Sequence, residues 1–327
     1  MQAPNQQPGG NWAWRDARQF YLQALTALDA RTRGEAAADL FRALGQIMHL
    51  VVDASVPEHT RDDPHPLGTL SNLLNRRRAG NYEYWVAAQH AGEAEGHFIT
   101  RYLSNPIGFD DSILRIPIPP GETVATVPIA RLIDTDRYRA DAPDANITLS
   151  GAIGLAEFAN ANFFSEDTLH GQFPFPRREA LVPSPRPAPG SSRVRAYLSK
   201  PDGQGLPTRV ALAECVTERG IGRWVVTSSP PYPCVDEAVW EETATHMLPR
   251  AVGYARGVLD YFFRGSLRVN RVLSLEDGFR IEIQNTSAER MDGLFDVYAR
   301  RQKGAPGERR EKVGALNAGG PIALNPG

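Results

Sequence analysis

The sequence of 327 residues predicts a mainly α fold, in which a multi-helix domain is followed by an incomplete β region. Apolar residues recur at helical spacing before Gly265, and after it they alternate with polar residues. The tail from Lys303 has few apolar residues and several glycines, so the expected strands lack enough partners for an independent sheet. We therefore expect a helical domain over residues 1–265 and a partial β domain over residues 266–327.

Several segments before residue 265 carry a helical pattern. The first ends at a break predicted for residues 32–34, and a second helix is expected over about residues 35–54. A long helix is expected over about residues 236–263, with a kink or restart at Pro249. The second helix has an apolar stripe, which predicts a core face, consisting of Leu40, Leu44, Ile47 and Val51, widened by Phe41, Met48 and Val52.

The remaining segments are assigned from their breakers and their alternation. Six prolines crowd the stretch of about 174–193, which predicts a loop or linker inside the helical domain. Residues 104–147 look irregular, and 151–164 are compatible with a helix. In the β region, Phe279, Ile281 and Ile283 alternate with polar residues, as in a half-buried strand.

Composition excludes some classes of function. The net charge of −2 provides no excess of positive charge for phosphates, so nucleic acid is a less favoured partner. No apolar run is long enough for a transmembrane segment, and the first residues do not resemble a signal peptide. The two cysteines, Cys215 and Cys234, either form a disulfide or remain core thiols, and their spacing leaves both possibilities open. Nothing indicates the oligomeric state.

Three residues near the end of the second helix form a candidate metal site. His49 and Asp53 are four residues apart and lie on one helical face, away from the apolar stripe. Pro57 ends the helix and lets His59 return towards the same place. Imidazole nitrogen and carboxylate oxygen are ligands that suit zinc, and a carboxylate can bridge two ions.

The longer pattern His-x-x-x-Asp-x-x-x-Pro-x-His, from His49 to His59, resembles the central metal-ligand segment of bacterial zinc-dependent phospholipase C and of the related single-strand-specific nucleases. Those enzymes hold three zinc ions in a helical domain. The resemblance implies that His49 binds one zinc, that Asp53 bridges it to a second and serves catalysis, and that His59 binds the third. Glu83, in Asn81–Val86, matches a further ligand of the third zinc.

The sequence departs from this family at two places. The family has a His four residues before the position of Glu83, where this chain has Ala79, and His65 is a candidate substitute. The family's other ligands lie upstream, but the 48 residues before His49 contain no His. We therefore expect a chain that lacks those ligands, either because the sequence is truncated or because they were lost.

The resemblance implies a zinc-dependent phosphodiester hydrolase, incomplete as given, with phospholipid as the first choice of substrate. The full-length protein would be secreted or periplasmic. The alternative is a non-catalytic scaffold or binding protein that keeps the helical fold with a degenerate metal site. Fold similarity alone does not separate the two.

Other candidate residues are assigned simpler roles. His90, Glu93 and His97 would share one helical face, but Gly92 and Gly96 weaken that helix and favour a solvated polar face. Neither His170 nor His246 has ligand-like neighbours at helical spacing, so both are expected to be structural or surface residues.

Overall fold

The computed structural model divides the chain into two compact units, which are described separately. Unit 1 comprises residues 1–49 and 258–327, and unit 2 comprises residues 50–257. The long helices α2 (Ala30–Asp53) and α8 (Glu237–Phe262) each contribute residues to both units. The structure describes residues 12–61, 82–92, 102, 155–165, 176, 178–187, 194–200, 209–215, 218–221, 224–227, 232–287 and 290–326.

The fold is mixed α and β, so the prediction of a mainly α class is wrong. Unit 2 contains antiparallel sheets between residues 182 and 234, inside the domain that was expected to be helical. All but one of these strands have only two to four residues, too few to show a clear period of two in the sequence. Among the described helices, none is long and apolar enough to cross a membrane.

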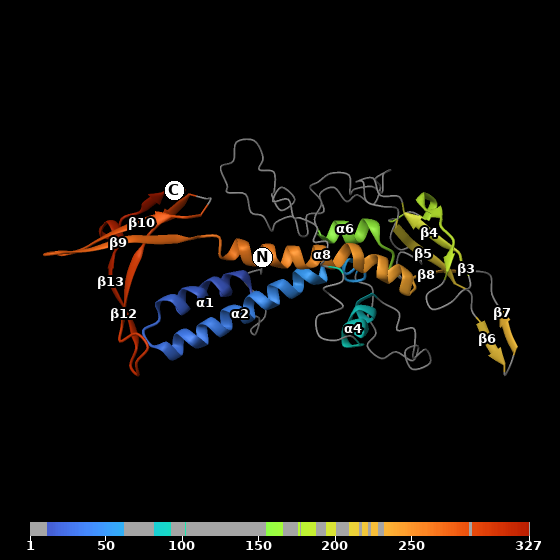
Figure 1. Ribbon diagram of the computed structural model, residues 1–327, viewed down its shortest axis with the longest axis horizontal. Coiled ribbons are helices and arrows are strands. Elements are labelled where there is room, and N and C mark those ends of the chain that lie inside the picture. The colour runs from blue at the N-terminus through green and yellow to red at the C-terminus, as the bar shows by residue number, and fades with distance from the viewer. Residues whose placement is uncertain are drawn as a thin grey trace, which may run out of the picture. The chain divides into compact units, whose positions relative to one another are not determined.

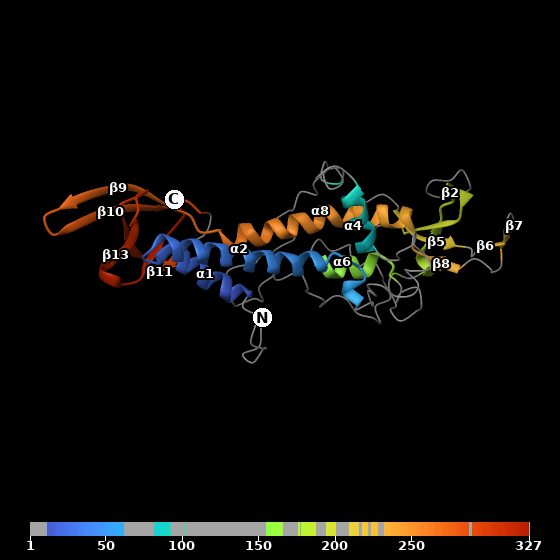
Figure 2. The ribbon, with the colours of Figure 1, turned by 90° about the horizontal axis from the view of Figure 1, so that it is seen from below.

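Unit 1 begins with α1 (Trp14–Thr26) and α2 (Ala30–Asp53), which lie side by side in both views (Figures 1 and 2). The break falls at residues 27–29, earlier than the predicted 32–34. Asp29 explains the difference, because its carboxylate accepts hydrogen bonds from the backbone N–H and hydroxyl of Thr32, both at 2.8 Å. These bonds satisfy a free N–H in the first turn and lower the pKa of Asp29.

A small core lies between the helices of unit 1. The C-terminal end of α8 (Glu237–Phe262) contributes Leu259 and Phe262 to it. Trp14 contacts the Phe262 ring edge to face, with centroids 5.2 Å apart. As predicted, the stripe on α2 is buried at Leu40 and Leu44, whereas Phe41 on its margin is exposed. The buried residues of this core are Ala17, Leu40, Ala43 and Leu44.

The β region of unit 1 consists of antiparallel pairs among the described residues. The hairpin of β9 (Leu267–Leu275) and β10 (Gly278–Asn285) turns at residues 276–277 (Figure 1). Its apolar face is largely open, and Phe279 is 69% exposed. The other pairs are β11 (Met291–Gly293) with β14 (Ile322–Leu324), and β12 (Asp296–Arg301) with β13 (Arg309–Ala315).

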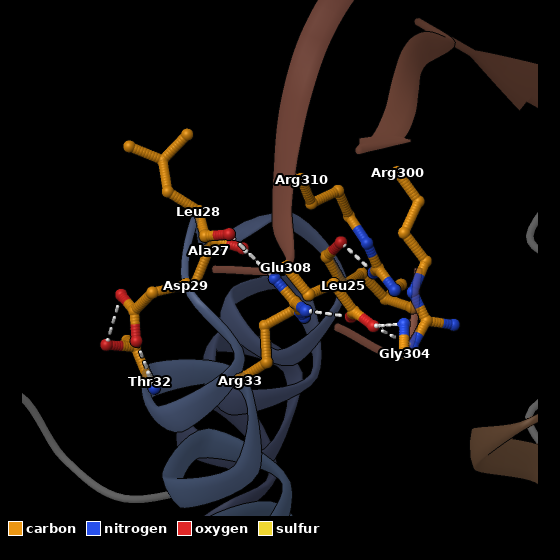
Figure 3. Close-up of polar contacts among 10 residues, drawn as sticks. All are labelled: Leu25, Ala27, Leu28, Asp29, Thr32, Arg33, Arg300, Gly304, Glu308 and Arg310. Carbon is orange, nitrogen blue, oxygen red and sulfur yellow. Dashed lines mark hydrogen bonds and ion pairs between the residues drawn. The ribbon is translucent and has the colours of Figure 1, made fainter. Parts of the chain in front are cut away.

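A polar cluster joins the α1–α2 turn to the β12–β13 loop within unit 1 (Figure 3). The Arg33 guanidinium lies 2.6 Å from the Glu308 carboxylate, and both side chains are 9% exposed. Arg33 also donates to the carbonyls of Ala27 (3.1 Å) and Leu28 (2.7 Å). Glu308 accepts a second guanidinium, from Arg300 at 2.8 Å, so it is held by two cations.

Unit 2 contains the 3₁₀ helix η1 (His59–Arg61), α4 (Tyr82–Gly92), α6 (Leu155–Asn162) and most of α8. α6 falls within the helix expected at residues 151–164. α8 spans nearly the length predicted, and Pro249 lies inside it without ending it.

The four-stranded sheet of unit 2 has the order β1-β4-β5-β8, and β2 pairs with β3 and β6 with β7 in two-stranded sheets. β1 (Val182–Pro183) and the separate strand β2 (Arg186–Pro187) arise from the proline-rich stretch predicted to be a loop. Pro183 is tolerated because β1 is an edge strand, where a missing N–H costs little. The other strands are β3 (Val194–Arg195), β4 (Tyr197–Lys200), β5 (Arg209–Cys215), β6 (Glu218–Ile221), β7 (Trp224–Thr227) and β8 (Tyr232–Cys234).

Cys234 is disulfide-bonded, and the only other cysteine in the chain is Cys215. Strand β8 pairs with β5 so that Cys234 lies opposite Ala213, two residues before Cys215. Of the two possibilities left open by the spacing, the structure therefore has the disulfide.

Candidate metal centre

The candidate site lies where α2 ends and the chain turns into η1. Successive turn bonds run from the Ser55 N–H to the Val52 carbonyl (2.8 Å) and from the Val56 N–H to the Asp53 carbonyl (3.0 Å). Residues 55–58 are buried, and Pro57 lies among them. Across this turn the His59 ring comes to lie 3.6 Å from the Asp53 carboxylate, at the end of α2.

His59 lies between two carboxylates in unit 2. Its Nδ1 is 3.6 Å from Asp53 Oδ1, and its Nε2 is 3.3 Å from Glu83 Oε2. Glu83 is in the first turn of α4, 24 residues further along the chain. The three side chains are partly accessible, with Glu83 the most exposed at 54%. The structure therefore brings together three of the four residues predicted as ligands.

The His59–Glu83 distance suits two ligands of one zinc ion. The distance from zinc to an imidazole nitrogen or a carboxylate oxygen is about 2.0–2.1 Å. At tetrahedral angles, two such donor atoms are therefore about 3.3 Å apart. The observed 3.3 Å equals that separation, although a weak hydrogen bond is also compatible with it. The donor types and this spacing fit part of a zinc site.

Asp53 approaches the other ring nitrogen, and the two nitrogens of one imidazole point in different directions. A single ion cannot therefore be held by His59 together with both carboxylates in this arrangement. Consistently, no group of three or more His, Cys, Asp or Glu residues with the geometry of a metal site occurs in the described ranges. Asp53 instead places a carboxylate beside Nδ1, while Nε2 faces Glu83.

His49 lies one helical turn before Asp53 on the continuous helix α2 and is exposed. Their spacing of four residues places them on one face of that helix, as the sequence predicts. His90 is exposed near the end of α4. The expectation that His246 lacks a ligand-like neighbour at helical spacing is wrong, because Glu242 lies one helical turn earlier and its carboxylate is 3.6 Å from Nε2 of the buried His246. The other candidates, His65, Ala79, Glu93, His97 and His170, lie outside the described residues.

Two buried residues beside the site were not singled out from the sequence. Glu58 Oε1 accepts a hydrogen bond from the Tyr82 backbone N–H at 3.0 Å, so the residues before His59 and Glu83 are also in contact. The pKa of the Tyr82 phenol is raised far above its ordinary value by burial, then by the charge of Glu58 and by Tyr102. Only a charged residue next to His59, in the sequence Pro-Glu-His, hinted at this role.

Arg61 is the second of these buried residues. Its side chain is 3% exposed, and it donates to the carbonyls of Pro57 (3.3 Å) and Phe163 (2.7 Å) and to the Ser165 hydroxyl (3.3 Å). A further bond reaches the carbonyl of Asn160. These bonds fix η1, and with it His59, against the end of α6.

Comparisons with protein-family models, with curated proteins and with solved structures find no match to this chain. The resemblance to zinc-dependent phospholipase C therefore depends on the residues themselves, chiefly the His49–His59 pattern and Glu83.

Proposed function

We propose that the protein is a zinc-dependent phosphodiester hydrolase resembling phospholipase C, with phospholipid as its first choice of substrate. His59 and Glu83 would hold one zinc ion, and His49 and Asp53 would contribute to a neighbouring zinc site. The observation that carries the proposal is the 3.3 Å separation of His59 Nε2 and Glu83 Oε2, two residues matched to one zinc by the sequence pattern.

The donor set determines what these residues can do. Zinc, when bound, lowers the pKa of a coordinated water and neutralises charge on a phosphoryl oxygen. Asp53 supplies negative charge beside Nδ1 of His59, and Glu83 places a carboxylate beside Nε2 of the same ring. Because these side chains are partly accessible, a phosphodiester headgroup in solution or at a lipid surface could reach them.

The disulfide at Cys234 supports the expected location of the full-length protein. Disulfides persist in secreted and periplasmic proteins and are rare in the reducing cytosol. A secreted or periplasmic protein is therefore proposed.

The test is zinc-dependent release of phosphorylated headgroup from phospholipid vesicles, with single-stranded DNA as the competing substrate. We expect slow headgroup release by the parent chain and little release of nucleotide. Asp53→Asn should abolish release, because it removes charge at the zinc site with little change of shape. Asp277→Asn, in the exposed turn between β9 and β10, is the matched control and should behave like the parent.

The competing function is a non-catalytic scaffold with a degenerate metal site. The observation in its favour is Ala79, which stands where the family has a His ligand. Zinc binding without turnover of either substrate would favour the scaffold. In that case the parent and Asp53→Asn would be equally inactive.

A further inference from the structure

We propose that Glu58 is a positioning residue, which holds the N-terminus of α4 so that Glu83 faces His59. This inference rests on the proposed zinc site, since it assigns how one pair of its ligands is kept in place. Glu58 itself touches neither zinc nor substrate in this proposal.

Two consecutive residues of the α2–η1 turn meet two consecutive residues at the start of α4. Glu58 Oε1 accepts the Tyr82 N–H at 3.0 Å, and His59 Nε2 lies 3.3 Å from Glu83 Oε2. Glu58 precedes His59, and Tyr82 precedes Glu83. Holding Glu58 against Tyr82 therefore restricts the distance between His59 and Glu83.

The contact stabilises the end of a helix. Tyr82 is the first residue of α4, and its N–H is among the four that have no partner inside the helix. A carboxylate at this end also interacts favourably with the helix dipole. Glu58 and Tyr82 are 6% and 3% exposed, so water competes weakly for this hydrogen bond.

Glu83 needs such support more than the other ligands do. Its side chain is 54% exposed, whereas Asp53 and His59 are on a segment fixed by backbone turn bonds and by Arg61. An exposed glutamate samples several rotamers. Its carboxylate can meet His59 in one of them only if the helix holds the backbone of Glu83 in the right place.

The first experiment is zinc titration of the full chain as a double-mutant cycle. Glu58→Ala should weaken zinc binding about tenfold. This is the lower end of the loss in metal affinity expected when the residue that supports a metal ligand is removed. Glu58→Gln keeps an oxygen acceptor and should stay close to the parent. In a Glu83→Ala background, Glu58→Ala should have no further effect, because Glu58 acts through Glu83. Glu276→Ala is the matched control on an exposed turn.

The second experiment is hydrogen exchange of residues 82–92 without metal. Glu58→Ala should speed exchange in the first turn of α4, and Glu58→Gln should not. Unchanged exchange, an additive cycle, or equal losses for Glu58→Ala and Glu58→Gln would overturn the inference. If the parent binds no zinc, the proposed function fails, and hydrogen exchange alone decides whether Glu58 holds α4.

Discussion

His59 contacts a carboxylate through each of its ring nitrogens, and the two contacts have different chemical uses. The distance from Nε2 to Glu83 matches two ligands of one zinc ion, whereas the 3.6 Å from Nδ1 to Asp53 is too long for a hydrogen bond. Asp53 therefore acts on His59 through charge. One imidazole links the two parts of the proposed site.

Glu83→Gln should weaken zinc binding by about tenfold or more, because a neutral amide oxygen is a poorer zinc ligand than a carboxylate. Isothermal titration with zinc measures the change. The matched variant Glu276→Gln, in the exposed turn between β9 and β10, should bind as the parent does. Equal affinity of Glu83→Gln and the parent would remove Glu83 from the proposed ligand set.

The arrangement of the site was partly predictable from the sequence. The shared helical face of His49 and Asp53, and the return of the chain after Pro57, follow from the helix period and from proline geometry. Glu83 was found only through the family resemblance, since 24 residues separate it from His59. Glu58 remained hidden because its partner is a backbone N–H, which no side-chain pattern reveals.

At the scale of single elements, η1 depends on a buried guanidinium. Arg61→Ala should lower the free energy of unfolding of unit 2 by about 3 kcal/mol, because it leaves the carbonyls of Pro57, Asn160 and Phe163 without this donor. Urea denaturation, with hydrogen exchange of residues 155–165, measures the loss. Arg178→Ala, at an exposed arginine, is the control and should stay near the parent. Equal stabilities would contradict the anchoring role.

The acid stability of unit 1 should depend on Glu308. Hydrogen bonds from Arg300 and Gly304 lower the pKa of Glu308 from 4.5 to about 2. A lowered pKa means that the stabilisation is complete above about 4.5 and is lost as the pH falls towards about 2. The parent should therefore have a higher Tm than Glu308→Gln at pH 7, and the difference should shrink between pH 4.5 and 2.

Thermal unfolding at a series of pH values tests this dependence. Glu276→Gln serves as a control for a glutamate in an exposed turn. A difference in Tm between the parent and Glu308→Gln that stays constant from pH 7 to pH 2 would contradict it.

α2 begins before the break that the sequence predicts at Thr32 to Gly34. That prediction depends on Gly34, because glycine disfavours helix interiors. The structure instead begins the helix at Ala30, where Asp29 accepts two hydrogen bonds from Thr32. A local cap thus outweighed the cost of one glycine, whose added Cβ would meet nothing within 4 Å.

For the whole molecule, long helices were easier to predict than short strands. The apolar stripes of α2 and α8 extend over several turns, and the hairpin of β9 and β10 has clear alternation. The strands of unit 2 have two to seven residues, and those in the proline-rich stretch pair at an edge. Each of these short strands is stabilised by a partner strand elsewhere in the chain, which a local sequence pattern does not reveal. The predicted fold class was therefore mainly α instead of mixed α and β.

The most direct test of the proposed function is the position of zinc in crystals of the protein soaked with the metal. Anomalous diffraction at the zinc edge locates the ion without reference to activity. We predict a zinc peak about 2 Å from both His59 Nε2 and a carboxylate oxygen of Glu83. Crystals in which His59 and Glu83 keep their separation with no zinc between them, or in which zinc binds only elsewhere, would contradict the proposal.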